Sequence, residues 1–289
     1  MKCVRRCSAV LMVLLGAFAQ QLTQAESLPE YAEPAKIATL ENDKINESSG
    51  LAVSRRAANR FWTHNDSGDK PRLFCFDLKG RHLGTSKLSD AKAVDWEDMC
   101  SFELDGISWV LVADTGDNGV RRKSCRLYLA EEPKKPGDEI KRLQKIRLTY
   151  STGPMDCEAM GVDPVSRRLL LVEKRPWINC RVFEAKLPEF GQREVVAQPI
   201  ATVNLPMVTA MDVSPDGRRA IVMTLGQAFE YHREPEESWS KAFKRKPRTI
   251  GMPARRQGEA ICYGADGKEL FLTSELTPTP LFKIAVKNK

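Results

Sequence analysis

The sequence predicts an all-β fold, a five-bladed β-propeller, and three observations support this prediction. A short segment that opens on a polar residue recurs five times, and its opening residues are separated by 48, 61, 51 and 50 positions. Turns rich in Gly, Pro and Asp follow these segments, and strongly apolar strands follow the turns. No stretch shows a sustained 3.6-residue apolar period. A period near 50 residues with about four strands per unit is typical of a propeller blade.

The elements of the repeat can be placed along the chain. Each opening polar residue is followed by a small residue or an aspartate and then by Leu, Met or Ile, in residues 49–54, 97–102, 158–163, 209–214 and 259–264. Second strands are predicted at 109–113, 169–172, 220–223 and 270–272, and third strands at 72–78, 126–130 and 181–185. Short strands at this regular spacing indicate a sheet-only architecture.

The last repeat is too short for a comfortable four-stranded blade. Residues 35–40, which precede the first repeat, have the composition of a strand. We expect this N-terminal strand to close the last blade, because a circular array otherwise ends in an exposed strand edge.

Residues 1–25 have the features of a secretory signal peptide. Lys2, Arg5 and Arg6 precede an apolar run at 9–19, which is too short to cross a bilayer, and Ala25 ends a small-residue cleavage pattern. We therefore expect residues 26–289 to form a single β-propeller domain that is secreted or periplasmic, with no membrane anchor. Loss of three positive charges lowers the net charge from +7 to about +4, which gives little support for nucleic-acid binding.

Six cysteines follow the predicted cleavage site. An even number of cysteines in an oxidising compartment allows up to three disulfide bonds. No C-x-x-C motif is present, so a zinc knuckle is disfavoured. Cys100 and Cys262 lie among apolar residues, and buried free thiols are the alternative there.

The opening residues of the repeats predict a metal site. The first strand of each propeller blade lines the central channel, so these five side chains are expected around one axis: Ser49, Glu97, Glu158, Thr209 and Glu259. Three carboxylates in a narrow channel require a cation or protonation. Oxygen-only ligands favour a hard cation, and calcium tolerates irregular geometry better than magnesium. The sequence thus predicts a calcium ion, with a water-filled channel as the alternative.

A second ring of polar residues is expected from the loops between the second and third strands. These loops supply catalytic candidates, Asp66, Asp114 and Asp117, and substrate-binding candidates, His64, Asn65, Asn118, Lys174, Arg175 and Glu275. The acids would position water, and the bases would hold a small anionic substrate. Asp and Asn before glycine also form ordinary tight turns, which is the alternative for the loops at 66–68 and 117–119.

Two resemblances bear on this interpretation. The strings ESSGLA (47–52), WTHNDSG (62–68), DWED (95–98) and DTGDN (114–118) resemble a family of exported bacterial propeller proteins without a settled activity, over nearly all of the chain after residue 25. The axial set is similar, more distantly, to the calcium-binding axis of the calcium-activated apyrases, five-bladed nucleotide diphosphohydrolases with serine, glutamate, glutamate, serine and glutamate on successive blades. Thr209 departs from serine. Few other residues match, so this second resemblance implies a metal site more than a substrate.

Two functions follow, and the sequence leaves both open. One is a metal-dependent hydrolase of phosphate esters or anhydrides, in which calcium organises water for attack. The other is a non-catalytic binding or scaffold propeller whose ion holds the blades together. A third hypothesis, polyanion binding by the basic stretch 241–248, competes with an ordinary solvated loop. The oligomeric state is not predicted.

Overall fold

The computed structural model describes residues 28–287, and within them the chain is almost entirely β-structure. It contains twenty strands and one short helix, α1 (Trp239–Ala242). The predicted signal peptide lies outside the described residues. No helix within 28–287 is long and apolar enough to span a membrane.

Three of the sheets have four strands each, in sequential order from the centre outwards. The first contains β2 (Ser48–Val53), β3 (Arg60–Asn65), β4 (Arg72–Asp77) and β5 (His82–Lys87). Another contains β14 (Val208–Val213), β15 (Arg219–Thr224), β16 (Ala228–His232) and β17 (Arg248–Ile250). The last contains β18 (Ala260–Tyr263), β19 (Leu270–Thr273), β20 (Pro280–Ile284) and, at its outer edge, the N-terminal strand β1 (Ala35–Thr39).

The fourth sheet has eight strands, because two groups of four join at their outer edges. One group is β6 (Trp96–Leu104), β7 (Ile107–Asp114), β8 (Cys125–Glu131) and β9 (Leu143–Tyr150). The other is β10 (Cys157–Asp163), β11 (Arg168–Glu173), β12 (Cys180–Lys186) and β13 (Glu194–Val203). β13 and β9 pair in parallel, whereas all pairs inside each group are antiparallel. The junction gives both outer strands a hydrogen-bonding partner.

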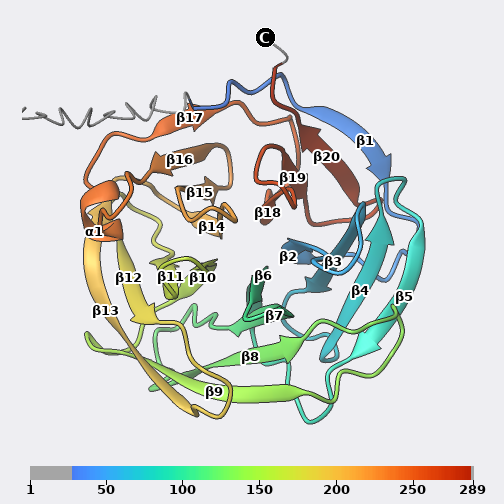
Figure 1. Ribbon diagram of the computed structural model, residues 1–289, viewed down its shortest axis with the longest axis horizontal. Helices are drawn as coiled ribbons and strands as arrows, with labels where there is room; N and C mark the ends of the chain where they lie inside the picture. The colour runs from blue at the N-terminus through green and yellow to red at the C-terminus, as the bar shows by residue number, and fades with distance from the viewer. Residues whose placement is uncertain (1–27, 288–289) are drawn as a thin grey trace, which may run out of the picture.

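The sheets stand around a central axis as a β-propeller (Figure 1). The inner strands form a closed ring, in which β2 packs against β6, β6 against β10, β10 against β14, β14 against β18, and β18 against β2. β1 pairs with β20, so the two ends of the described chain meet in one sheet. The strands predicted from the apolar segments are confirmed, since they lie within β4, β7, β8, β11, β12, β15 and β19.

The hydrophobic core lies between neighbouring sheets. Trp62 from β3, Trp96 from β6 and Tyr128 from β8 share one fully buried cluster there. The six cysteines at 75, 100, 125, 157, 180 and 262 occupy strands of these layers, and all are buried and free. The disulfide prediction is therefore wrong for the described structure. The thiols pack as small apolar groups within the hydrophobic clusters between the sheets.

Two buried aspartates tie the inner strands together. The Asp98 carboxylate in β6 accepts hydrogen bonds from the backbone amides of Met160 in β10 and Met211 in β14, at 2.8 and 3.0 Å. Asp212 in β14 accepts one from the amide of Tyr263 in β18 at 2.8 Å. Both carboxylates also accept the amide of the next residue in their own strand. These contacts connect four of the inner strands without a metal ion.

Candidate metal centre

The opening residue of four repeats lies at a β-bulge. The register of the inner strand with its neighbour shifts at Ser49, Glu97, Glu158 and Thr209, and Glu259 directly precedes β18. A bulge leaves one residue unpaired and redirects its side chain. The repeat in the sequence therefore corresponds to a repeated backbone irregularity at the same end of each inner strand.

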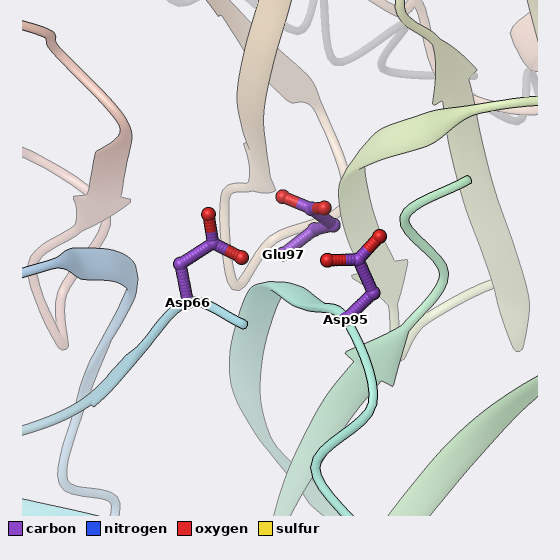
Figure 2. A group of neighbouring side chains, drawn as sticks. All are labelled: Asp66, Asp95 and Glu97. Carbon is purple, nitrogen blue, oxygen red and sulfur yellow. The ribbon is translucent and has the colours of Figure 1, made fainter. Parts of the chain in front are cut away.

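Three carboxylates converge at this end of the axis. Asp66 follows β3, Asp95 precedes β6 and Glu97 lies in β6, and one oxygen from each lies within 4.8 Å of the other two. Figure 2 shows the three side chains directed toward a common region. We call this group the axial triad. It brings together the first sheet and the β6–β9 group, which follow one another along the chain.

Two of the three carboxylates of the triad have no hydrogen-bond donor within the described part of the chain. Ser49 donates its hydroxyl to the Glu97 backbone carbonyl at 2.6 Å, but no group within residues 28–287 donates to the carboxylates of Glu97 or Asp95. Glu97 is nevertheless only 4% exposed. Asp66 accepts one bond, from the adjacent amide of Ser67. A buried carboxylate without a hydrogen-bond donor is costly, and the nearby ammonium group of Lys174 is paired with Glu158, so this arrangement suits a bound cation.

The pKa values of Glu97 and Asp95 are raised, as expected for carboxylates that lie close together with few donors. Burial raises the pKa of Glu97 well above its ordinary value, and the nearby carboxylates of Glu158 and Asp66 raise it further. Burial and the carboxylate of Asp66 raise the pKa of Asp95 to about 6. Like charges in a low-dielectric site disfavour the ionised form unless positive charge compensates them.

Gly116 allows the carboxylates to pack against the next loop. A Cβ atom at this position would lie 1.9 Å from Glu97 Oε1 and 2.5 Å from Asp95 Oδ2. The preceding residue, Thr115, fixes the loop by donating its hydroxyl to the Cys157 carbonyl at 2.7 Å. Close approach, and not an unusual φ, therefore requires glycine here.

The ammonium group of Lys174 lies near the carboxylates of the inner strands. Lys174 Nζ is 2.6 Å from Glu158 Oε2, and both side chains are largely buried. Burial alone would lower the pKa of Lys174, but attraction to Glu158, Glu259 and Glu97 outweighs it and leaves the pKa raised. Burial raises the pKa of Glu158 to about 8 and that of Glu259 to about 7. One lysine offsets part of the negative charge, on the side of Glu158.

The two hydroxyls of the predicted axial set bond to the backbone. Ser49 reaches the Glu97 carbonyl, and Thr209 donates to the Gly258 carbonyl at 2.8 Å. They connect the starts of neighbouring inner strands. The donor set that can hold a hard cation is therefore centred on the axial triad, and its three carboxylates offer up to six oxygens, a number that calcium accepts.

Asp114 and Asp117 belong to the loop that holds Arg122. Asp114 is fully buried, and its Oδ1 accepts from Arg122 Nη2 at 2.8 Å. Asp117 accepts the backbone amide of Arg122 at 2.7 Å, and Asn118 is exposed. These contacts indicate a loop-shaping role.

The remaining substrate-binding candidates are divided between the interior and the rim. His64 is fully buried in β3 and packs edge-on against Trp96. Asn65 is also buried, and its amide donates to the Lys44 carbonyl at 2.7 Å. Arg175, with a side chain 49% exposed, and the partly buried Glu275 lie nearer the solvent.

Sequence reasoning missed Asp95 as a candidate ligand. The pattern Asp95-Trp96-Glu97 recurs as Asp156-Cys157-Glu158. Residues i and i+2 of an extended strand share a face, so this spacing was a usable signal for a paired acid. Asp156 itself is buried and accepts the amide of Asp117 at 2.8 Å.

Comparisons with known proteins give structural likeness only. No family model and no curated protein matches the chain, so neither resemblance noted from the sequence gains support. A gluconolactonase, XC5397 from Xanthomonas campestris, is similar over 90% of this chain and 88% of its own, with a TM-score of 0.48 and 10% identity. The Dos1 propeller is similar over 90% of this chain and 96% of its own, with a TM-score of 0.40 and 8% identity. The fold assignment rests on the sheets themselves, and these likenesses carry no inference about activity.

Proposed function

We propose that this protein is an exported, five-bladed, calcium-binding β-propeller that hydrolyses a small anionic substrate, a phosphate ester or anhydride, at its axial mouth. The observation that carries the proposal is the buried Glu97 carboxylate, which has no hydrogen-bond donor among the described residues and faces Asp66 and Asp95. Export is proposed from residues 1–25, and neither nucleic acid nor a membrane anchor is part of the proposal.

The blade count follows from treating the eight-stranded sheet as two blades. Its two groups of four antiparallel strands meet only through the parallel pair β9 and β13. Five inner strands contact one another in a closed ring. This supports one blade per sequence repeat, with β1 completing the last.

Calcium is the cation that best suits the axial triad. All three side chains offer carboxylate oxygens, and no histidine or cysteine belongs to the group. Such a donor set favours a hard cation, and calcium accepts the irregular arrangement that loops and a bulge provide. When bound, the ion would polarise a phosphoryl oxygen and lower the pKa of a coordinated water.

The chain's own residues supply the rest of the proposed site. Asp66 and Asp95 are partly exposed, so a small ligand can reach the triad from the solvent. Lys174 stays protonated beside Glu158 and attracts anions to the mouth. Arg175 adds a half-exposed guanidinium on the neighbouring rim, where it forms a 3.5 Å ion pair with Glu173. Ser49 and Thr209 hold the starts of the inner strands at fixed positions.

A scaffold role for the ion is the second candidate, and one observation favours it. The triad joins residues from the first sheet and the β6–β9 group, so an ion there would cross-link them. Against a purely structural ion, the Ser49 hydroxyl already joins β2 to β6 through the Glu97 carbonyl, and Asp98 and Asp212 connect β6, β10, β14 and β18 through backbone amides. We therefore favour the hydrolase.

Calorimetric calcium titration of metal-stripped protein tests the site. The wild type should bind calcium, and Glu97→Gln should bind it on the order of tenfold more weakly or not at all. Glu103→Gln is the matched control, because Glu103 is an exposed glutamate of the same strand. Equal affinity in wild type and Glu97→Gln would refute the metal site.

A hydrolysis panel then separates the two candidate functions. Nucleotides, phytate and aryl phosphates are incubated with calcium-loaded wild type and with Glu97→Gln. Turnover that requires both calcium and Glu97 supports the hydrolase. Calcium binding that raises the melting temperature without turnover of any substrate would instead establish the scaffold role.

A further inference from the structure

The opposite end of the central axis carries a cavity that is independent of the proposed metal centre. It is an open hollow of about 420 Å³, and its walls come from the far ends of the inner strands and the turns that follow them. The axial triad lies at the starts of the same strands. The two sites therefore occupy opposite faces of the propeller.

The wall of this cavity is mostly apolar. Val162 and Pro164 come from the end of β10 and its turn, and Val213 and Pro215 come from the matching position after β14. Phe102 of β6 adds an aromatic surface. Proline and valine at equivalent turns give a rigid, weakly hydrated wall, which suits the apolar part of a ligand.

Arg55 supplies the cavity with an incompletely used positive charge. Its guanidinium donates to the Ser101 carbonyl from Nε and Nη2, at 3.2 and 2.9 Å, and to the Ala265 carbonyl from Nη1 at 3.3 Å. Arginine has five N–H groups, so one hydrogen on each terminal nitrogen has no acceptor within the described residues. The acceptors that Arg55 does use are neutral, and therefore none of them cancels its charge.

The neighbouring Arg56 differs in this respect. Its Nη2 forms a 2.7 Å ion pair with Glu131, and its Nε donates to the Glu132 carbonyl at 2.7 Å. Arg56 is thus engaged by a carboxylate of the chain itself. Of the two adjacent arginines that line the cavity, Arg55 is the one that forms no ion pair with a carboxylate of residues 28–287, although the buried Asp212 attracts it from beyond ion-pair distance.

We propose that this cavity binds a small organic carboxylate with an apolar body, whose carboxylate accepts from the terminal nitrogens of Arg55. The guanidinium fork matches a carboxylate in geometry and charge. The apolar part of the ligand lies against the valine and proline wall. Glu103, the acidic residue of the lining, is exposed and lies at the rim.

Calorimetric titration with 3-phenylpropanoate tests this proposal. Metal-free protein is used, so that calcium at the axial mouth cannot capture the probe. The wild type should bind 3-phenylpropanoate and should bind acetate and the neutral analogue 3-phenylpropanamide on the order of tenfold more weakly. Equal binding of the acid and the amide, or no binding of the acid at millimolar concentration, would overturn the proposal.

Two variants with the same change of charge locate the contact. Arg55→Gln should weaken binding on the order of tenfold, whereas Arg56→Gln should leave it within a factor of about two. Because Arg55→Gln also removes contacts to Ser101, a thermal melt verifies that it is folded. In the wild type, the Arg55 Nε–H resonance should shift on addition of the acid and not of the amide. Equal affinity in both variants, or an unshifted resonance, would contradict a site at Arg55.

Discussion

Two layers of acids lie on the same axis, and their surroundings differ. Asp98 and Asp212 are enclosed by backbone amides from adjacent inner strands. Asp66, Asp95 and Glu97, one layer closer to the mouth, face one another, and Asp95 and Glu97 have no hydrogen-bond donor in the part of the chain that the structure describes. Glu97 and Asp98 are adjacent in β6, yet backbone amides of the described residues donate to the Asp98 carboxylate and not to that of Glu97. A buried carboxylate stabilises the fold where amide donors surround it, and it is suited to binding a cation where they do not.

The largest expected loss of stability follows from mutation of Asp98, in the layer whose carboxylates are enclosed by backbone amides. Asp98→Ala leaves three inner-strand amides without their acceptor, so the free energy of unfolding should fall by about 4 kcal/mol or more. Urea denaturation of metal-free protein measures this. Asp43→Ala, at an exposed position, is the control and should change stability by less than about 0.5 kcal/mol. A comparable loss in both variants would remove the distinction between the layers.

The stability of the protein should also depend on pH through Asp212, the second buried aspartate of the same layer. Burial raises its pKa to about 7, although the amide of Tyr263, the positive charge of Arg55 and the amide of Val213 lower it in part. Between about pH 4 and pH 7 the folded protein keeps a proton that the unfolded chain has released, so this contribution to stability is present below pH 4 and is lost as the pH rises through 7. Urea denaturation at several pH values should show wild type losing about 3 kcal/mol more across this window than Asp212→Asn. Parallel pH profiles would contradict the assignment.

Mutation in the axial triad should not lower the free energy of unfolding of metal-free protein, in contrast to mutation of Asp98. Glu97→Gln removes an unpaired buried carboxylate, so metal-free protein should be as stable as wild type or more stable. Calcium at about 100 times its Kd should add about 2.7 kcal/mol to the unfolding free energy of wild type and almost nothing to that of the variant. Chemical denaturation with and without calcium measures both effects. The account fails if the variant loses stability as Asp98→Ala does.

The smallest effect is expected at the glycine beside the triad. Gly116→Ala forces a methyl group against Glu97 and Asp95, so calcium affinity should fall about tenfold, or about 1.4 kcal/mol. Gly119→Ala is the matched control in the same loop, since its new Cβ would meet no atom closer than 3.4 Å. Calcium titration of both variants compares them. Equal affinities would mean that the carboxylates can bind calcium without their present packing.

The repeat made much of the architecture predictable. It placed the inner strands, the second and third strands and the pairing of residues 35–39 with the last sheet. It did not reveal that β9 and β13 join two groups of strands, because that contact depends on outer edges whose approach no local pattern encodes. The even number of cysteines suggested disulfide bonds, but all six are buried and free, and only the apolar neighbours of Cys100 and Cys262 pointed to this outcome.

The candidate site was less predictable than the fold. The opening residues coincide with bulges, but bulge geometry decides where their side chains point, and a one-residue change of register reverses the face. Asp66 reaches Glu97 through a loop from the neighbouring sheet, so their proximity is not readable from spacing. His64 was expected in a loop at the mouth, yet it lies in β3 with its ring against Trp96.

Anomalous diffraction from crystals grown with calcium tests the central claim most directly. A single strong peak should lie about 2.3–2.6 Å from carboxylate oxygens of Asp66, Asp95 and Glu97. Absence of a peak among these three side chains at saturating calcium, or a peak held by a different set of residues, would contradict the assignment.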